Sequence, residues 1–98
     1  MRVVNEGAPS VLILAPVDGA RVPAGREIPV RAESRDAAVL WMAVNGARRW
    51  STGGDRLAGA WAPPPGTHTI VAVAEREGAP DAVDAVTIVA VADPAGAG

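Results

Sequence analysis

The sequence contains no cysteine, lysine, phenylalanine or tyrosine, and it has a single histidine. Without cysteine, disulfide bonds and thiolate metal sites are excluded. Without phenylalanine and tyrosine, a core must be built from valine, isoleucine, leucine, alanine and the three tryptophans. A length of 98 residues corresponds to one domain, which can bury enough surface to fold without such cross-links.

Charge and hydropathy exclude two further classes. Nine arginines face eleven acidic residues, and a net charge of -2 gives no electrostatic footprint for nucleic acid. No apolar run approaches the roughly 20 residues of a membrane-spanning helix. The residues after Met1 contain Arg2 but no apolar segment before Gly7, so no signal peptide is visible. If the protein is exported, we expect its targeting segment to lie outside this sequence.

The pattern of short apolar runs and turn residues is that of an all-β protein. No segment shows a helical period with caps, and turn signals recur every 8–12 residues. The segments expected to form strands are residues 10–15, 20–22, 27–33, 38–44, 47–52, 57–61, 67–75 and 83–92. This spacing predicts an Ig-like antiparallel β-sandwich of about seven strands, with a small open barrel as the alternative.

The stretch from Ala38 to Gly46 is the expected centre of one sheet. It is an apolar run that ends in Asn45-Gly46, and this dipeptide favours the type I′ turn of a β-hairpin. The strand that carries His68 is its expected neighbour. Around this domain, predicted to span residues 10–92, residues 1–9 read as a lead-in segment and residues 93–98 as a flexible tail.

Five segments in order carry a family resemblance. They are Ile13 to Ala20 (I-x-x-P-x-D-G), Ile28 to Ala32 (I-x-L-x-A), Trp41 to Gly46 (W-x-x-N/D-G), Trp61 to Pro63, and Pro64 to Ile70 (P-x-G-x-H-x-L). This set resembles the penicillin-binding protein C-terminal domain, the Ig-like module of 1C-type bifunctional peptidoglycan synthases. The match departs at two points: three residues rather than two separate Trp41 from Asn45, and Ala74 to Gly78 replaces the usual D-x-x-G.

The resemblance implies a non-catalytic accessory module of a bacterial cell-envelope protein, located in the periplasm or outside the cell. Its partner would be another protein or a neighbouring domain of a larger envelope protein, with glycan as a further candidate. No catalytic residue carries over, because those of such synthases lie in other domains. Two alternatives stay open: a carbohydrate-binding module, or a designed Ig-like domain without biological function.

The residues themselves offer little for catalysis or metal binding. His68 would need a nucleophile among Ser10, Ser34 and Ser51, and none lies in a nucleophile elbow. Aspartates gather near turns, but no D-x-D-x-D loop is present, and turn aspartates usually cap their own backbone. We therefore expect no enzyme activity, no metal and no cofactor.

The tryptophans divide into expected core and expected surface. Trp50 follows Arg48 and Arg49 in a polar hairpin arm, so these three residues form the predicted partner contact, and the carbohydrate-binding alternative uses them too. The alternative for Trp50 is a place over a sheet edge with an arginine stacked on it. The predicted core consists of Ile13, Ile28, Val30, Leu40, Trp41, Met42, Val44, Trp61, Ile70, Ala72 and Ile88.

Trp41 is the open case among them. Both faces of its strand are apolar, and strict alternation sets Trp41 against Leu40, Met42 and Val44. If Met42 fills the core position, Trp41 lies on the opposite face and becomes a second candidate for partner contact.

Overall fold

The computed structural model describes residues 9–92, which form eight strands and no helix. The strands are β1 (Ser10–Ala15), β2 (Arg21–Pro23), β3 (Ile28–Arg35), β4 (Val39–Val44), β5 (Ala47–Thr52), β6 (Arg56–Trp61), β7 (Gly66–Glu75) and β8 (Ala82–Val91). The described residues accordingly contain no helix that could cross a membrane. The predicted tail at 93–98 and, apart from Pro9, the predicted lead-in at 1–9 lie outside the described residues.

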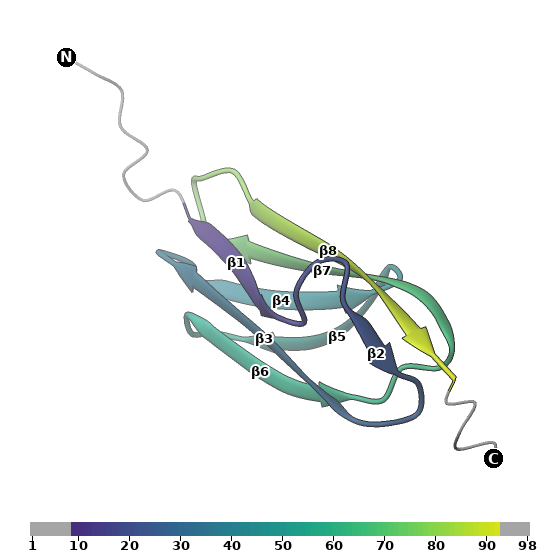
Figure 1. Ribbon diagram of the computed structural model, residues 1–98. Coiled ribbons are helices and arrows are strands. Elements are labelled where there is room, and N and C mark those ends of the chain that lie inside the picture. Colours follow the sequence, from purple (N-terminus) through teal and green to yellow (C-terminus); the bar gives the residue numbers. More distant parts are fainter. Residues whose placement is uncertain (1–8, 93–98) are drawn as a thin grey trace.

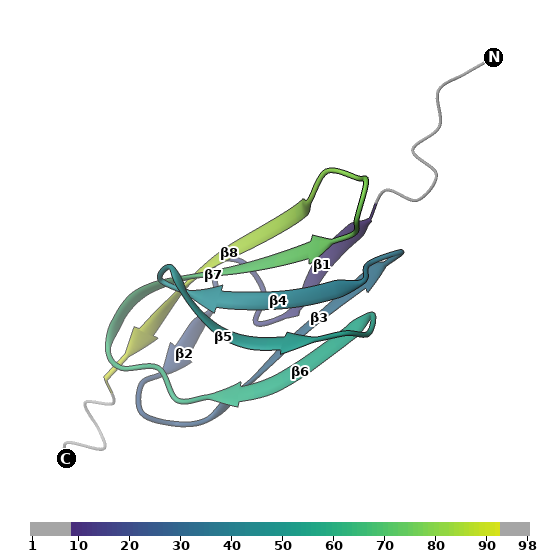
Figure 2. The same ribbon diagram turned by 180° about the vertical axis from the view of Figure 1, so that it is seen from behind.

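The strands form two sheets that pack face to face (Figures 1 and 2). One sheet has the order β1-β3-β6 and the other the order β2-β8-β7-β4-β5. All neighbouring strands are antiparallel except the short β2, which runs parallel to β8. The all-β, Ig-like sandwich predicted from the sequence is confirmed, with eight strands rather than about seven.

The core fills the space between the two sheets. Leu40, Met42, Ile70 and Ile88 are fully buried, and they come from three adjacent strands of the larger sheet. The smaller sheet contributes Val30 from its central strand. Of the residues expected in the core, the structure buries Ile13, Ile28, Val30, Leu40, Met42, Val44, Trp61, Ile70, Ala72 and Ile88.

The structure differs from the predicted core at one residue, Trp41. It is only half-buried and lies outside the core cluster, on the opposite face of β4 from Leu40 and Met42. Successive side chains of a strand point to opposite faces, so burying Leu40, Met42 and Val44 together forces Trp41 outward. The Asn45-Gly46 turn holds this register, with positive φ values of 52° and 89° at its two residues.

Two aspartates satisfy backbone groups at the strand edges. The Thr87 N–H of β8 donates to Asp18 Oδ1 at 2.8 Å, and the Ile13 N–H of β1 donates to Asp84 Oδ2 at 2.8 Å. Asp84 therefore links a strand of one sheet to an edge strand of the other. Each aspartate therefore satisfies one backbone N–H that the sheet pairing leaves open.

Asn45 links the β4–β5 hairpin to β7. Its backbone N–H donates to the Thr69 carbonyl, and its Oδ1 accepts the Thr69 N–H at 2.9 Å. This leaves Nδ2 to donate to His68 Nδ1 at 2.9 Å. His68 Nε2 lies 2.7 Å from the Pro64 carbonyl, which can only accept, so the imidazole proton sits on Nε2.

We predict that Asn45→Gly lowers the free energy of unfolding by about 1–2 kcal/mol. Glycine adopts the positive φ freely but removes both side-chain hydrogen bonds. Asn45→Ala should lower it by about 1 kcal/mol more, because alanine resists the left-handed conformation. Urea unfolding of the two variants measures the difference, and equal stabilities would contradict a role of the turn conformation.

Candidate binding surface

The side of the sandwich between β5 and β6 carries the arginines and the tryptophan predicted as a partner contact. A bulge at Arg49 lets Trp50 oppose Met42 while Arg48 opposes Ala43. The bulge therefore sends Trp50 to the inner face of the sheet and Arg48 to the outer face. The three residues do not form one patch, because Arg48 lies on a different face from Trp50.

Trp50 is half-buried rather than exposed, and it packs against the core. Its indole lies against Gly59 of β6, where an added Cβ would come within 2.6 Å of the indole Nε1. The Arg49 guanidinium lies 5.5 Å from the Trp50 ring and 5.9 Å from the Trp61 ring. Trp50 thus seals the gap between β5 and β6, and its ring is not an open platform for a sugar. In the sequence, Gly59 is the residue that could have indicated this packing, because a glycine within a strand often marks the close approach of another group to the backbone.

We predict that Gly59→Ala destabilises the fold by about 1–3 kcal/mol, the usual cost of overpacking. The methyl group would displace Trp50, and this shows as a red shift of the tryptophan emission. Gly53→Ala is the matched control, because its added Cβ meets only one backbone oxygen at 3.9 Å. A Gly59→Ala variant as stable as the control would contradict the close packing.

The outer face of the larger sheet holds a second cluster, made of Trp41, Arg48 and Glu75. The Trp41 Nε1–H donates to Glu75 Oε2 at 2.7 Å, and the Arg48 guanidinium carbon lies 4.0 Å from the centre of the Trp41 ring. The indole is therefore fixed at its edge by a carboxylate and covered on one face by a cation. The sequence could not show this cluster, because Glu75 lies 34 residues from Trp41.

We predict that Glu75→Ala lowers stability by about 1 kcal/mol, because it removes the acceptor of a half-buried indole N–H. Glu75→Gln is the matched control, since its amide oxygen can still accept that hydrogen bond. Thermal unfolding together with the Trp41 indole proton shift checks both variants. Equal melting temperatures for the alanine and glutamine variants would show that the hydrogen bond contributes nothing.

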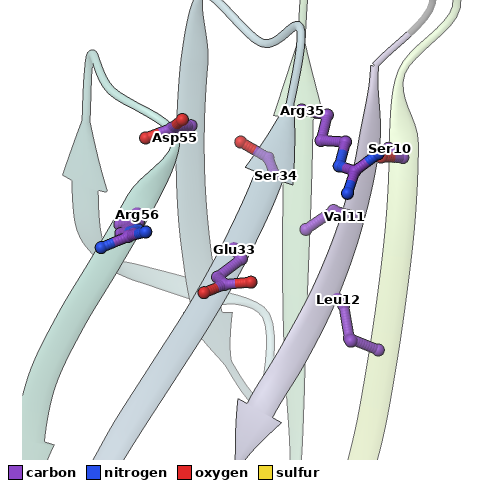
Figure 3. A pocket seen from close by; sticks show the side chains of 8 residues that line it. All are labelled: Ser10, Val11, Leu12, Glu33, Ser34, Arg35, Asp55 and Arg56. Atoms are coloured by element: carbon purple, nitrogen blue, oxygen red, sulfur yellow. The ribbon is translucent and has the colours of Figure 1, made fainter.

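The smaller sheet carries a shallow hollow of about 510 Å³ near the start of β1 (Figure 3). Its lining residues are Ser10, Val11, Leu12, Glu33, Ser34, Arg35, Asp55 and Arg56. Ser34 Oγ is buried and has no hydrogen-bond partner. The charged groups of the lining make no ion pair with one another. The hollow is therefore not organised by an ion-pair network among its lining residues.

The histidine and aspartates considered for catalysis or metal binding form hydrogen bonds that belong to the fold. His68 is buried, both of its ring nitrogens have partners, and it packs edge-on against Trp61 at 5.1 Å between ring centroids. Asp18 and Asp84 accept backbone N–H groups. Within residues 9–92, no three histidine, cysteine, aspartate or glutamate side chains form a group suited to a metal ion.

Comparison with known proteins and solved structures supports the fold. The solved structures include a similar one, described as fibronectin(III)-like modules of Clostridium thermocellum CbhA. It aligns with a TM-score of 0.72 at 18% sequence identity, over 84% of this chain and 96% of that chain. No protein-family model and no curated protein matches the sequence. The chain thus has the fold of a fibronectin(III)-like module, and the finer likeness to the 1C-type domain is not confirmed.

Proposed function

We propose that this chain is a non-catalytic structural or binding module of a larger bacterial cell-envelope protein. One observation carries the proposal. The described chain enters at one end of the sandwich, at the start of β1, and leaves at the opposite end, after β8 (Figure 1). A module built in this way can sit in line between other domains and hold them apart.

The side chains support a binding or structural role. His68 has hydrogen-bond partners on both ring nitrogens, Asn45 and the Pro64 carbonyl, and so contributes to the fold. Arginine and tryptophan are enriched where proteins bind one another, and Arg48 and Trp41 meet on an exposed sheet face. This favours a protein partner over a glycan, because Arg48 covers one face of the Trp41 ring and Trp50 is tucked against Gly59.

The envelope context rests on the resemblance of five ordered segments to the 1C-type C-terminal domain. On this proposal, the module would accompany glycosyltransferase and transpeptidase domains and act in the periplasm. It would contribute a contact to a neighbouring domain or to another envelope protein, with Arg48 and Trp41 in the contact.

The complete open reading frame and cell fractionation test this proposal together. We expect the reading frame to encode further domains, and an antibody against this chain to detect the product in the envelope fraction. Transglycosylase and transpeptidase domains upstream would support the synthase context. A product that consists of this chain alone, or one found only in the cytoplasm, would contradict the proposal.

A further inference from the structure

The edge strands of the two sheets are β1, β2, β5 and β6, and three of them are irregular, short or capped. β1 has a register shift between Ile13 and Ala15, and its Ile13 N–H is taken by the half-buried Asp84. β2 has three residues and ends at Pro23, and β5 carries the bulge at Arg49. Bulges, short strands, proline and inward-pointing charges are features by which proteins discourage an edge from pairing with another strand.

β6 lacks these features. It is the outermost strand of the smaller sheet (Figures 1 and 2), and it pairs with β3 from Arg56 to Trp61 without a register shift. It contains no proline, and Arg56 is its single charged residue. Among the edge strands of residues 9–92, β6 is therefore the one that is both long and regular.

The main-chain groups of β6 point alternately towards β3 and away from it. The Ser34 N–H donates to the Asp55 carbonyl at 2.8 Å, so the main-chain groups of Asp55 face β3. In an antiparallel strand, successive residues face opposite neighbours, so every second residue after Asp55 also faces β3. The N–H and C=O groups that face away, without a hydrogen-bond partner within residues 9–92, belong to Arg56, Ala58 and Ala60.

No described side chain closes this free edge. All three residues whose main-chain groups face away are exposed, and two of them are alanines. Trp50 packs against Gly59 on the inner face of β6, the face on which Leu57 is buried. The indole therefore fills the space between the sheets and leaves the edge itself open to an added strand.

Unpaired arginines lie along the same edge. Arg56 is the first residue of β6, Arg31 lies beside its centre on β3, and Arg49 lies 5.9 Å from the ring of its last residue. Within residues 9–92, none of these three forms an ion pair. The paired stretches of β3 and β6 hold one carboxylate, that of Glu33, and Asp55 directly precedes β6. Three guanidinium groups therefore outnumber two carboxylates along this edge.

We propose that the free edge of β6 binds an extended, acidic segment of a partner protein, which adds to the smaller sheet as a fourth strand. Main-chain hydrogen bonds to Arg56, Ala58 and Ala60 supply the affinity, and carboxylates of the segment meet the unpaired arginines. The six residues of β6 span roughly 20 Å, so the bound segment is about six residues long. This contact is additional to the one proposed on the larger sheet.

A titration followed by nuclear magnetic resonance tests the proposal. The probe is an acetylated eight-residue peptide of alternating valine and glutamate, because recognition through the main chain requires no particular sequence. We expect saturable binding with a Kd below about 1 mM. The largest amide shifts, and slower hydrogen exchange on binding, should occur at Arg56, Ala58 and Ala60. The same peptide with every residue N-methylated carries the same charges but donates no main-chain hydrogen bond, and it should not bind.

Substitutions at Ala58 locate the contact. Ala58→Pro removes an N–H that faces away from β3, a position at which an edge strand tolerates proline, and it should weaken peptide binding at least tenfold. Ala58→Val is the matched control, because it keeps the N–H and should bind like the unaltered chain. Ala58→Glu also keeps the N–H but repels the acidic peptide, so it should weaken binding even if the proline variant does not fold. Circular dichroism checks the fold of each variant.

Three results would overturn the proposal. The first is no binding of the valine–glutamate peptide at about 1 mM. The second is equal binding of the N-methylated peptide, which would mean that charge alone attracts it. The third is sedimentation of the chain as a dimer with the same three amides protected, which would make a second copy the occupant of the edge. Each result leaves the proposed function intact, because that rests on the reading frame and the location.

Discussion

The alternation of β4 is the constraint on which the rest of this structure depends. Leu40, Met42 and Val44 point into the space between the sheets, and the first two are fully buried. Asn45 then reverses the chain with a positive φ and fixes the hairpin to β7 through Thr69 and His68. With that end fixed, a slip by one residue would expose all three apolar side chains, so the register has no freedom.

The same constraint determines the outer surface. It places Trp41 on the solvent side, where Glu75 and Arg48 hold it. In the neighbouring strand, a bulge at Arg49 sets Trp50 opposite Met42 and Arg48 opposite Ala43. One strand's two faces therefore supply both the centre of the core and the centre of the surface that we propose to bind another molecule.

Local signals explain how far sequence reasoning reached. Apolar runs between turn residues predicted the strands and the sandwich, and Asn45-Gly46 predicted the hairpin, because each signal acts within a few residues. Trp41 was included in the predicted core with its face left open, because both faces of its strand are apolar and periodicity does not tell which face is buried.

Other features depend on distant partners. Asp84 and Ile13 are 71 residues apart, Asp18 and Thr87 are 69 apart, and only the folded chain brings them together. The half-buried position of Trp50 follows from Gly59, whose pairing with Val30 of β3 sets it opposite the indole. The candidate site was therefore predictable in its residue types, and its division between two faces was not.

Proton–proton contacts of the Trp41 indole test the central claim most directly. The ring protons of Trp41 should show nuclear Overhauser contacts to Val73, its neighbour across the sheet, and to the Arg48 methylenes. They should show none to Val30 or Ile13, which lie in the core. Contacts from Trp41 to those two core residues would mean that β4 is turned over, and the account of both faces would then be wrong.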